Sequence, residues 1–90
     1  MLIVSYDISD DKLRSKFSRF LSKFGYRLQY SMFEIKNSKR ILGIVEAEIR
    51  NRFEKRFGES DSIMILHLSK QCKVTKYGYA KNDDADLIII

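Results

Sequence analysis

The segment MLIVSYDISDD, residues 1–11, determines how the rest of the chain is interpreted. It opens with a short apolar run and a tyrosine, which is typical of a buried β-strand that stops at Asp7. The residues that follow, Ser-Asp-Asp at 9–11, carry side-chain oxygens and negative charge that favour the start of a helix. We therefore expect Asp7 at a junction between a strand and a helix, where it either caps the turn or carries chemistry.

Length and composition predict one small globular domain. A chain of 90 residues has a small core that gains from a partner subunit, and 44% hydrophobic residues without any proline exclude a disordered chain. The apolar runs resemble no signal peptide and fall short of the roughly 20 residues that span a bilayer, so we expect no membrane association. The single cysteine, Cys72, excludes an intrachain disulfide and favours a cytoplasmic location.

The net charge of +5 is unevenly distributed. Residues 10–56 carry thirteen Lys and Arg against six Asp and Glu, whereas the remainder carries four against six. A local excess of this kind attracts a polyanion, and nucleic acid is the first candidate. Solvated helix faces also accumulate basic residues, so charge alone leaves both interpretations open.

Apolar spacing predicts two helices. The first follows residue 11 and ends at Gly25, a residue suited to the left-handed position after a helix. The second begins at Asn37 or Ser38 and ends at Gly58. Their apolar stripes consist of Leu13, Phe17, Phe20, Leu21 and Phe24 in the first helix, and of Ile41, Val45, Ile49 and Phe53 in the second.

Five segments are strand-like: Met1–Tyr6, Tyr26–Ile35, Asp61–Leu68, about Val74–Tyr79, and the terminal Leu87–Ile90. The second of them changes its apolar phase at Phe33, which predicts a bulge near Met32 or a strand covered on both faces. The third is apolar at nearly every position and is expected at the centre of the sheet.

We assign the chain to the α+β class, as a ferredoxin-like βαββαβ sandwich with an additional C-terminal strand. Residues 1–79 form the domain, and residues 80–90 form a polar linker and the last strand. The terminal LIII would promote aggregation unless it pairs with a sheet edge, either its own or a partner's. The partner's edge in a homodimer is preferred, because the small core gains most from that arrangement.

Two motifs at this spacing, YDISDDKLRSK at 6–16 and RLQYSMFE at 27–34, resemble the Cas-two endoribonuclease family of CRISPR-associated proteins. FGESDSIMI at 57–65 and the segment around Gly78 extend the resemblance over nearly the whole chain. The resemblance implies a ferredoxin-fold homodimer whose C-terminal strand crosses to the partner. It also implies metal-dependent cleavage of RNA or DNA, and a place beside the integrase in the complex that inserts spacers into a CRISPR array.

The same resemblance implies that Asp7 is a metal ligand and that Arg14, Lys16 and Arg27 line the nucleic-acid site. Lys16 departs from the arginine common at its position, and lysine lacks the forked donor geometry that suits phosphate. One carboxylate is a poor metal site, but a two-fold dimer presents Asp7 twice around one Mg²⁺, which accepts few protein carboxylates. The ion would activate water and neutralise phosphate charge while the basic side chains hold the phosphate.

Other candidate residues are better explained by structure. We interpret Tyr6 and Phe33 as core or interface aromatics rather than base-stacking ones, Asp10 and Asp11 as helix caps, His67 as a core or interface histidine, Cys72 as structural, and residues 82–86 as a solvated linker rather than a calcium loop.

Three functions are compatible with these patterns. The first is a Mg²⁺-dependent nuclease, and the second is a non-catalytic dimer that bridges integrase subunits and carries a DNA duplex on its basic face. The two can coexist, and the shortage of catalytic groups favours the scaffold as much as the enzyme. The third, an RNA-binding module of the RRM type, requires an aromatic-rich octamer on the third strand, which SIMILHLS at 62–69 does not supply.

Overall fold

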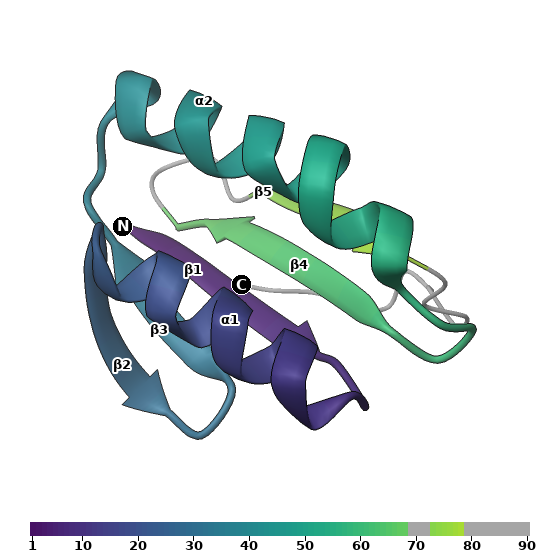
Figure 1. Ribbon diagram of the computed structural model, residues 1–90. Coiled ribbons are helices and arrows are strands. Elements are labelled where there is room, and N and C mark those ends of the chain that lie inside the picture. The colour runs from purple at the N-terminus through teal and green to yellow at the C-terminus, as the bar shows by residue number, and fades with distance from the viewer. Residues whose placement is uncertain (69–72, 79–90) are drawn as a thin grey trace.

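The computed structural model describes residues 1–68 and 73–78 as a succession of strands and helices (Figure 1). The elements are β1 (Leu2–Asp7), α1 (Asp11–Ser22), β2 (Gly25–Gln29), β3 (Met32–Ile35), α2 (Lys39–Glu48), the π-helical turn η1 (Ile49–Phe53), the 3-10 turn η2 (Glu54–Arg56), β4 (Ser62–His67) and β5 (Lys73–Gly78). Cys72, the linker at 82–86 and the predicted strand Leu87–Ile90 lie outside the described residues. No helix in the described ranges is long and apolar enough to cross a membrane.

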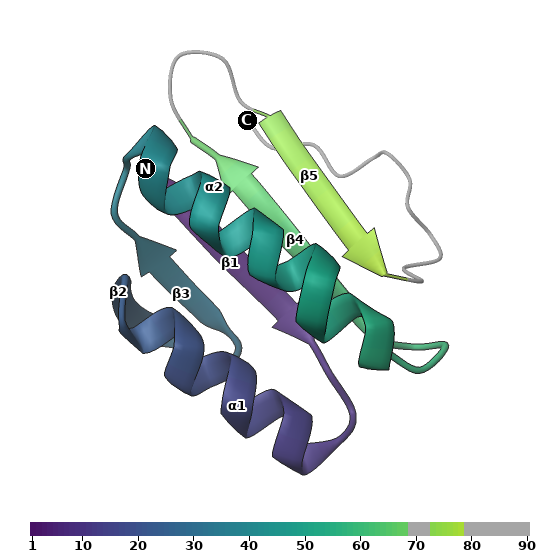
Figure 2. The same cartoon turned by 45° about the horizontal axis from the view of Figure 1, so that its top comes forward.

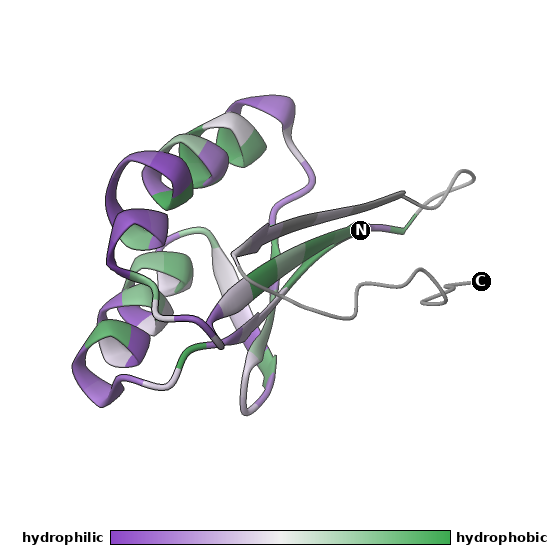
Figure 3. Cartoon of the chain, turned by 90° about the vertical axis from the view of Figure 1, so that its right-hand side faces the viewer, coloured by the Kyte–Doolittle hydropathy of each residue, from purple (hydrophilic) through white to green (hydrophobic). Residues whose placement is uncertain are grey.

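The strands form one sheet in the order β2-β3-β1-β4-β5, with antiparallel pairing between all neighbours. Both helices lie on the same face, α1 toward β2 and β3, and α2 toward β1 and β4 (Figure 2). In the edge-on view of Figure 3, neither helix covers the opposite face of the sheet. This arrangement confirms the predicted α+β class and the ferredoxin-like βαββαβ sandwich. The further strand of the sheet is β5, whereas the predicted additional strand at 87–90 lies outside the described residues.

The prediction of a single strand over Tyr26–Ile35 is wrong. The chain reverses at Tyr30 and Ser31, so the segment is a hairpin of β2 and β3. A reversal restarts the alternation of side chains, which explains why the apolar phase changes at Phe33. The hairpin supplies the strand that the predicted segments lacked for a βαββαβ order.

The predicted left-handed cap at Gly25 is also wrong. Helix α1 ends at Ser22 with Lys23 in a right-handed conformation, and Gly78 is the only glycine of the described residues with a positive φ. Gly25 instead begins β2 so close to β3 that an added Cβ would overlap the carbonyl oxygen of Glu34. Glycine is required there by backbone approach rather than by dihedral freedom.

The core lies between the helices and the sheet, and it is rich in phenylalanine. The ring of Phe17 lies 5.1 Å from that of Tyr6 and 4.9 Å from that of Phe53, both in edge-on geometry. Full burial of one such side chain stabilises the fold by roughly 1.5–3 kcal/mol. The predicted stripes are confirmed, because their members are buried except for Phe24, which is partly exposed.

Candidate nucleic-acid interface and metal ligand

Asp7 ends β1 as an exposed carboxylate and pairs in register with Ser62 of β4. Side chains alternate along a strand, so Asp7 projects to the face opposite Val4 and Tyr6, which belong to the helix-covered core. Within residues 1–68 and 73–78, no group of three or more His, Cys, Asp or Glu side chains is placed to hold a metal ion. Within the described part of one protomer, Asp7 therefore belongs to no group of three or more such ligands.

The loop that follows Asp7 is held by the buried carboxylate of Asp61. Asp61 is 2% exposed, and its Oδ1 accepts hydrogen bonds from the backbone N–H of Ser9 at 2.9 Å and from the Ser9 hydroxyl at 3.0 Å. Its Oδ2 accepts a third bond from the N–H of Gly58 at 2.8 Å. Burial alone raises the pKa of Asp61, but these hydrogen bonds outweigh it and lower the pKa below the ordinary value of 3.8.

Sequence reasoning did not identify Asp61 as important. The available signal was a single acid between a glycine turn and an apolar strand, FGESDSIMI at 57–65. That pattern gives no indication of a partner 52 residues away in the chain.

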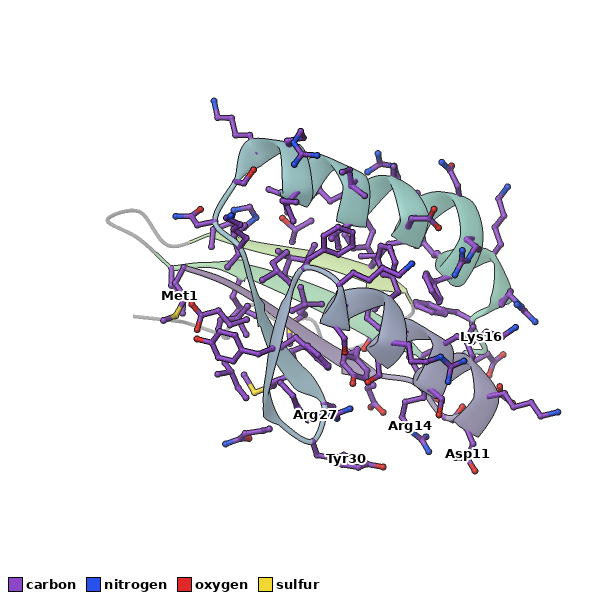
Figure 4. The ribbon with its side chains drawn as sticks, turned by 60° about the vertical axis from the view of Figure 1, so that its left-hand side comes forward. Met1, Asp11, Arg14, Lys16, Arg27 and Tyr30 are labelled. Atoms are coloured by element: carbon purple, nitrogen blue, oxygen red, sulfur yellow. The ribbon has the colours of Figure 1, made fainter. Side chains whose placement is uncertain are left out.

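A concavity of about 310 Å³ lies on the other side of the β1 end, between α1 and the β2–β3 hairpin. We call it the arginine pocket; its lining includes Tyr6, Arg14, Ser18, Arg27 and Tyr30. Figure 4 shows Arg14, Arg27 and Tyr30 gathered beside the hairpin tip. The structure therefore brings together two of the predicted site residues, Arg14 and Arg27.

Arg14 is tied to the start of its own helix. Its guanidinium donates to the backbone carbonyl of Ile8 at 2.9 Å and forms an ion pair with Asp11. The hydrogen bond to Asp11 raises the pKa of Arg14 above its ordinary value. The positive charge of Arg14 is therefore held at the loop between β1 and α1.

Arg27 connects three elements around the arginine pocket. It donates to the carbonyl of Tyr30 at 2.6 Å and to the hydroxyl of Ser18 at 2.7 Å, and it lies 5.0 Å from the ring centroid of Phe33. A guanidinium held on three sides has few rotamers left, so its charge has a defined position.

Lys16 lies apart from the arginine pocket. Residues two apart on a helix do not share a side. Lys16 lines one concavity between α1 and the turns after α2 and another on α1 alone, and neither is lined by Arg14 or Arg27. The same separation is visible in Figure 4.

Several residues were interpreted as structural rather than functional. Those that the structure describes occupy structural positions. Tyr6 and Phe33 are 4% and 1% exposed, so neither ring is available to stack on a base. Asp10 caps α1 by accepting from the N–H of Leu13 at 2.8 Å. His67 is partly buried at the end of β4, and its Nε2 is buried without a hydrogen-bond partner in the described part of the chain.

Tyr30 was missed as a site residue. It is 74% exposed at the hairpin turn and lines the arginine pocket. Tyr30 is exposed because it lies in the turn between β2 and β3. The interpretation of Tyr26–Ile35 as one continuous strand therefore did not predict this exposure.

Comparison with known proteins agrees with the sequence motifs. The family model described as CRISPR associated protein Cas2 matches residues 1–76. The chain belongs to the Cas2 family. A Cas2 relative from Methanospirillum hungatei JF-1, named CRISPR-associated endoribonuclease Cas2 2, is 30% identical over 90 residues, which cover 98% of this chain and 97% of the relative.

Two further relatives extend the comparison. The CRISPR-associated endoribonuclease Cas2 of Mycobacterium tuberculosis is 38% identical over 77 residues, covering 86% of this Cas2 chain and 65% of the relative. A solved crystal structure of a hypothetical protein from Thermus thermophilus superimposes with a TM-score of 0.53 at 26% identity, covering 93% and 85% of the two chains. The family assignment predicted from the motifs at 6–16 and 27–34 is confirmed.

Proposed function

We propose that this Cas2 protein is a cytoplasmic, Mg²⁺-dependent endonuclease that cleaves RNA or DNA phosphodiester bonds during CRISPR adaptation. The observation that carries the proposal is the position of Asp7, an exposed carboxylate at the end of β1 on the sheet face that neither helix covers. The relatives' names support the reaction class, because they are called endoribonucleases.

The uncovered sheet face supports a homodimer. Ser5 pairs in register with Met32 and Met64 on its two sides, so the three side chains share the face that carries Asp7. Leu66 adds another apolar side chain there, opposite Ile3. A second copy packed face to face on this patch would exclude water from it. It would also bring the two β1 ends that carry Asp7 toward each other.

Asp7 fits Mg²⁺ as one of a small number of ligands. It is exposed, and its carboxylate accepts no hydrogen bond from a described residue, so its oxygens are free to coordinate. Mg²⁺ retains several waters and is commonly held by one or two protein carboxylates, which Asp7 from each of two copies would supply. When bound, the ion would supply an activated water and neutralise charge on the phosphate.

The arginine pocket binds a part of the substrate away from Asp7, because the pocket lies on the other side of the β1 end. Arg27 presents a positioned guanidinium beside the exposed ring of Tyr30, where a phosphate and a neighbouring base can be held. Asp61 holds the loop after Asp7, so the strand end is placed by a buried network rather than by a free loop.

The direct test incubates purified protein with labelled single-stranded RNA and with duplex DNA, each in Mg²⁺ or EDTA. We expect cleavage of at least one substrate in Mg²⁺, its loss in EDTA and its loss in Asp7→Asn. Glu59→Gln is the matched control, because it neutralises another exposed acid in the turn before β4. Cleavage that survives Asp7→Asn would overturn the proposal.

A second role as a scaffold is favoured by the basic surface of α1. A Cas2 dimer would carry a DNA duplex on this surface and bridge subunits of the CRISPR integrase. In that role Asp7→Asn leaves spacer integration intact, whereas charge reversal along α1 abolishes it. Deletion of residues 87–90 tests whether the terminal LIII contributes to assembly.

A further inference from the structure

The guanidinium of Arg14 contacts the loop between β1 and α1, which follows Asp7. Its Nη1 donates to the backbone carbonyl of Ile8 at 2.9 Å and, more weakly, to the carbonyl of Ser9 at 3.5 Å. Its Nη2 donates to the carboxylate of Asp11 in the first turn of α1. Figure 4 shows Arg14 beside Asp11 at this end of the helix. One planar side chain therefore joins the loop to the start of the helix.

The same loop is held from a second side by Asp61. The carboxylate of Asp61 accepts hydrogen bonds from the backbone N–H and the hydroxyl of Ser9. The side chain of Ile8, between them and Asp7, is 2% exposed and belongs to the core. The backbone after Asp7 is thus fixed by a carbonyl contact, a carboxylate contact and a buried side chain, while the carboxylate of Asp7 stays exposed.

The two predicted arginines of the arginine pocket differ in the groups that they bind. Arg14 forms an ion pair with Asp11, which compensates part of its charge. Arg27 donates to neutral acceptors, the carbonyl of Tyr30 and the hydroxyl of Ser18, which leave its charge uncompensated. An uncompensated guanidinium attracts phosphate more strongly, so Arg27 suits a substrate contact better than Arg14 does.

We propose that Arg14 is a positioning residue for Asp7: it holds the loop that follows Asp7 and does not bind the substrate phosphate. The inference rests on the proposed function for the role of Asp7, and it assigns Arg14 a role other than the nucleic-acid contact that the resemblance implies. Arginine suits this position because its two terminal nitrogens reach a carbonyl and a carboxylate at the same time. Lysine has one terminal nitrogen and no such fork.

The experiment compares two substitutions of Arg14 with one matched control. Arg14→Gln removes both the charge and the fork, whereas Arg14→Lys keeps the charge and removes the fork. Arg19→Gln is the control, because Arg19 is an exposed arginine of the same helix that lines the same pocket, and no described hydrogen bond joins it to the loop. Circular dichroism verifies that all three variants are folded.

The first measurement is amide hydrogen exchange at Ser9 by NMR, in EDTA. The N–H of Ser9 donates to Asp61, and it exchanges with solvent only when the loop opens. We expect both Arg14 variants to raise its exchange rate about tenfold, as for one lost charge-assisted hydrogen bond, and Arg19→Gln to leave it within about twofold. Unchanged exchange in both Arg14 variants would overturn the inference.

The second measurement separates a positioning role from a merely structural one. Mn²⁺ binding is followed by electron paramagnetic resonance, because the ion reports the position of Asp7 itself. We expect both Arg14 variants to bind Mn²⁺ about tenfold more weakly, with Arg19→Gln unchanged. Wild-type affinity in Arg14→Lys together with weak binding in Arg14→Gln would mean that charge acts rather than the fork, and would overturn the inference.

The third measurement asks whether Arg14 contacts phosphate. Binding of a fluorescein-labelled single-stranded RNA is followed by anisotropy in EDTA, over a series of NaCl concentrations. We expect Arg27→Gln to reduce the slope of log K against log [NaCl] by about 0.7, as for one lost phosphate contact on a single strand, and Arg14→Gln to leave the slope unchanged. Equal reductions in the two variants would make Arg14 a phosphate contact and overturn the inference.

The three measurements together distinguish this inference from the proposed nuclease. Mn²⁺ binding and cleavage that depend on Asp7 but are unchanged in both Arg14 variants would leave the nuclease standing and remove the role of Arg14. A wild type that neither binds Mn²⁺ nor cleaves would overturn the proposed function. Exchange at Ser9 and the RNA slope would in that case still decide whether Arg14 holds the loop or binds phosphate.

Discussion

The carboxylate of Asp61 accepts hydrogen bonds from both the backbone N–H and the hydroxyl of Ser9, 52 residues earlier in the chain. Ser9 lies two residues after Asp7, and Asp61 immediately precedes Ser62, the register partner of Asp7. The buried carboxylate of Asp61 therefore fixes two segments beside the candidate metal ligand. One is the loop between β1 and α1, which follows Asp7, and the other is the turn before β4, which precedes Ser62.

Replacing Asp61 by alanine is expected to lower the free energy of unfolding by about 2–3 kcal/mol, because the backbone N–H groups of Ser9 and Gly58 lose a buried, charged acceptor. Urea denaturation measures the change. Glu59→Ala, an exposed acid in the same turn, is the control and should change the free energy by less than about 0.5 kcal/mol. Equal effects of the two substitutions would contradict the assigned role of Asp61.

The lowered pKa of Asp61 also predicts a pH dependence. A carboxyl with a lower pKa in the folded than in the unfolded state stabilises the fold fully above its unfolded pKa, near 3.8, and loses that contribution as pH falls through the folded pKa. The difference in unfolding free energy between wild type and Asp61→Asn should therefore be largest at neutral pH and shrink in acid, below about pH 4. Urea denaturation at several pH values measures this difference in unfolding free energy. A difference that grows as the pH falls would contradict the lowered pKa of Asp61.

Gly78→Ala is expected to destabilise the fold by more than about 2 kcal/mol. The φ of Gly78 is +103°, and an added Cβ would lie 2.7 Å from the Cα of Ser62 on β4. Gly43→Ala is the matched control, since no atom lies within 4 Å of an added Cβ at that exposed position in α2. Alanine there should stabilise the helix by up to about 1 kcal/mol. Thermal denaturation of both variants tests the contrast, and a neutral Gly78→Ala would contradict the strained backbone.

The helices could be predicted because their signal is local. Phe17, Phe20 and Leu21 recur with helical spacing and are buried as that spacing requires. The hairpin escaped prediction because its turn, Tyr30-Ser31, contains none of the Gly, Pro, Asn or Asp residues that usually mark a reversal. Because this turn was not predicted, the exposed position of Tyr30 was not predicted either.

The candidate site was predictable residue by residue but not as an arrangement. Arg14 and Lys16 are close in sequence, yet two positions along a helix turn a side chain to another side of the axis. Lys16 consequently lines the concavity between α1 and the turns after α2, whereas Arg14 lines the arginine pocket. The role of Asp61 depends on a contact between distant loops, which local patterns do not reveal.

The most direct test of the central claim is to count the ions bound at Asp7. Mn²⁺ serves as the probe in place of Mg²⁺, and electron paramagnetic resonance measures the bound fraction during titration of the purified protein. We expect one ion for every two chains in the wild type and none in Asp7→Asn, with Glu59→Gln unchanged. One ion for each chain, or binding that persists in Asp7→Asn, would contradict a site shared by Asp7 of two copies.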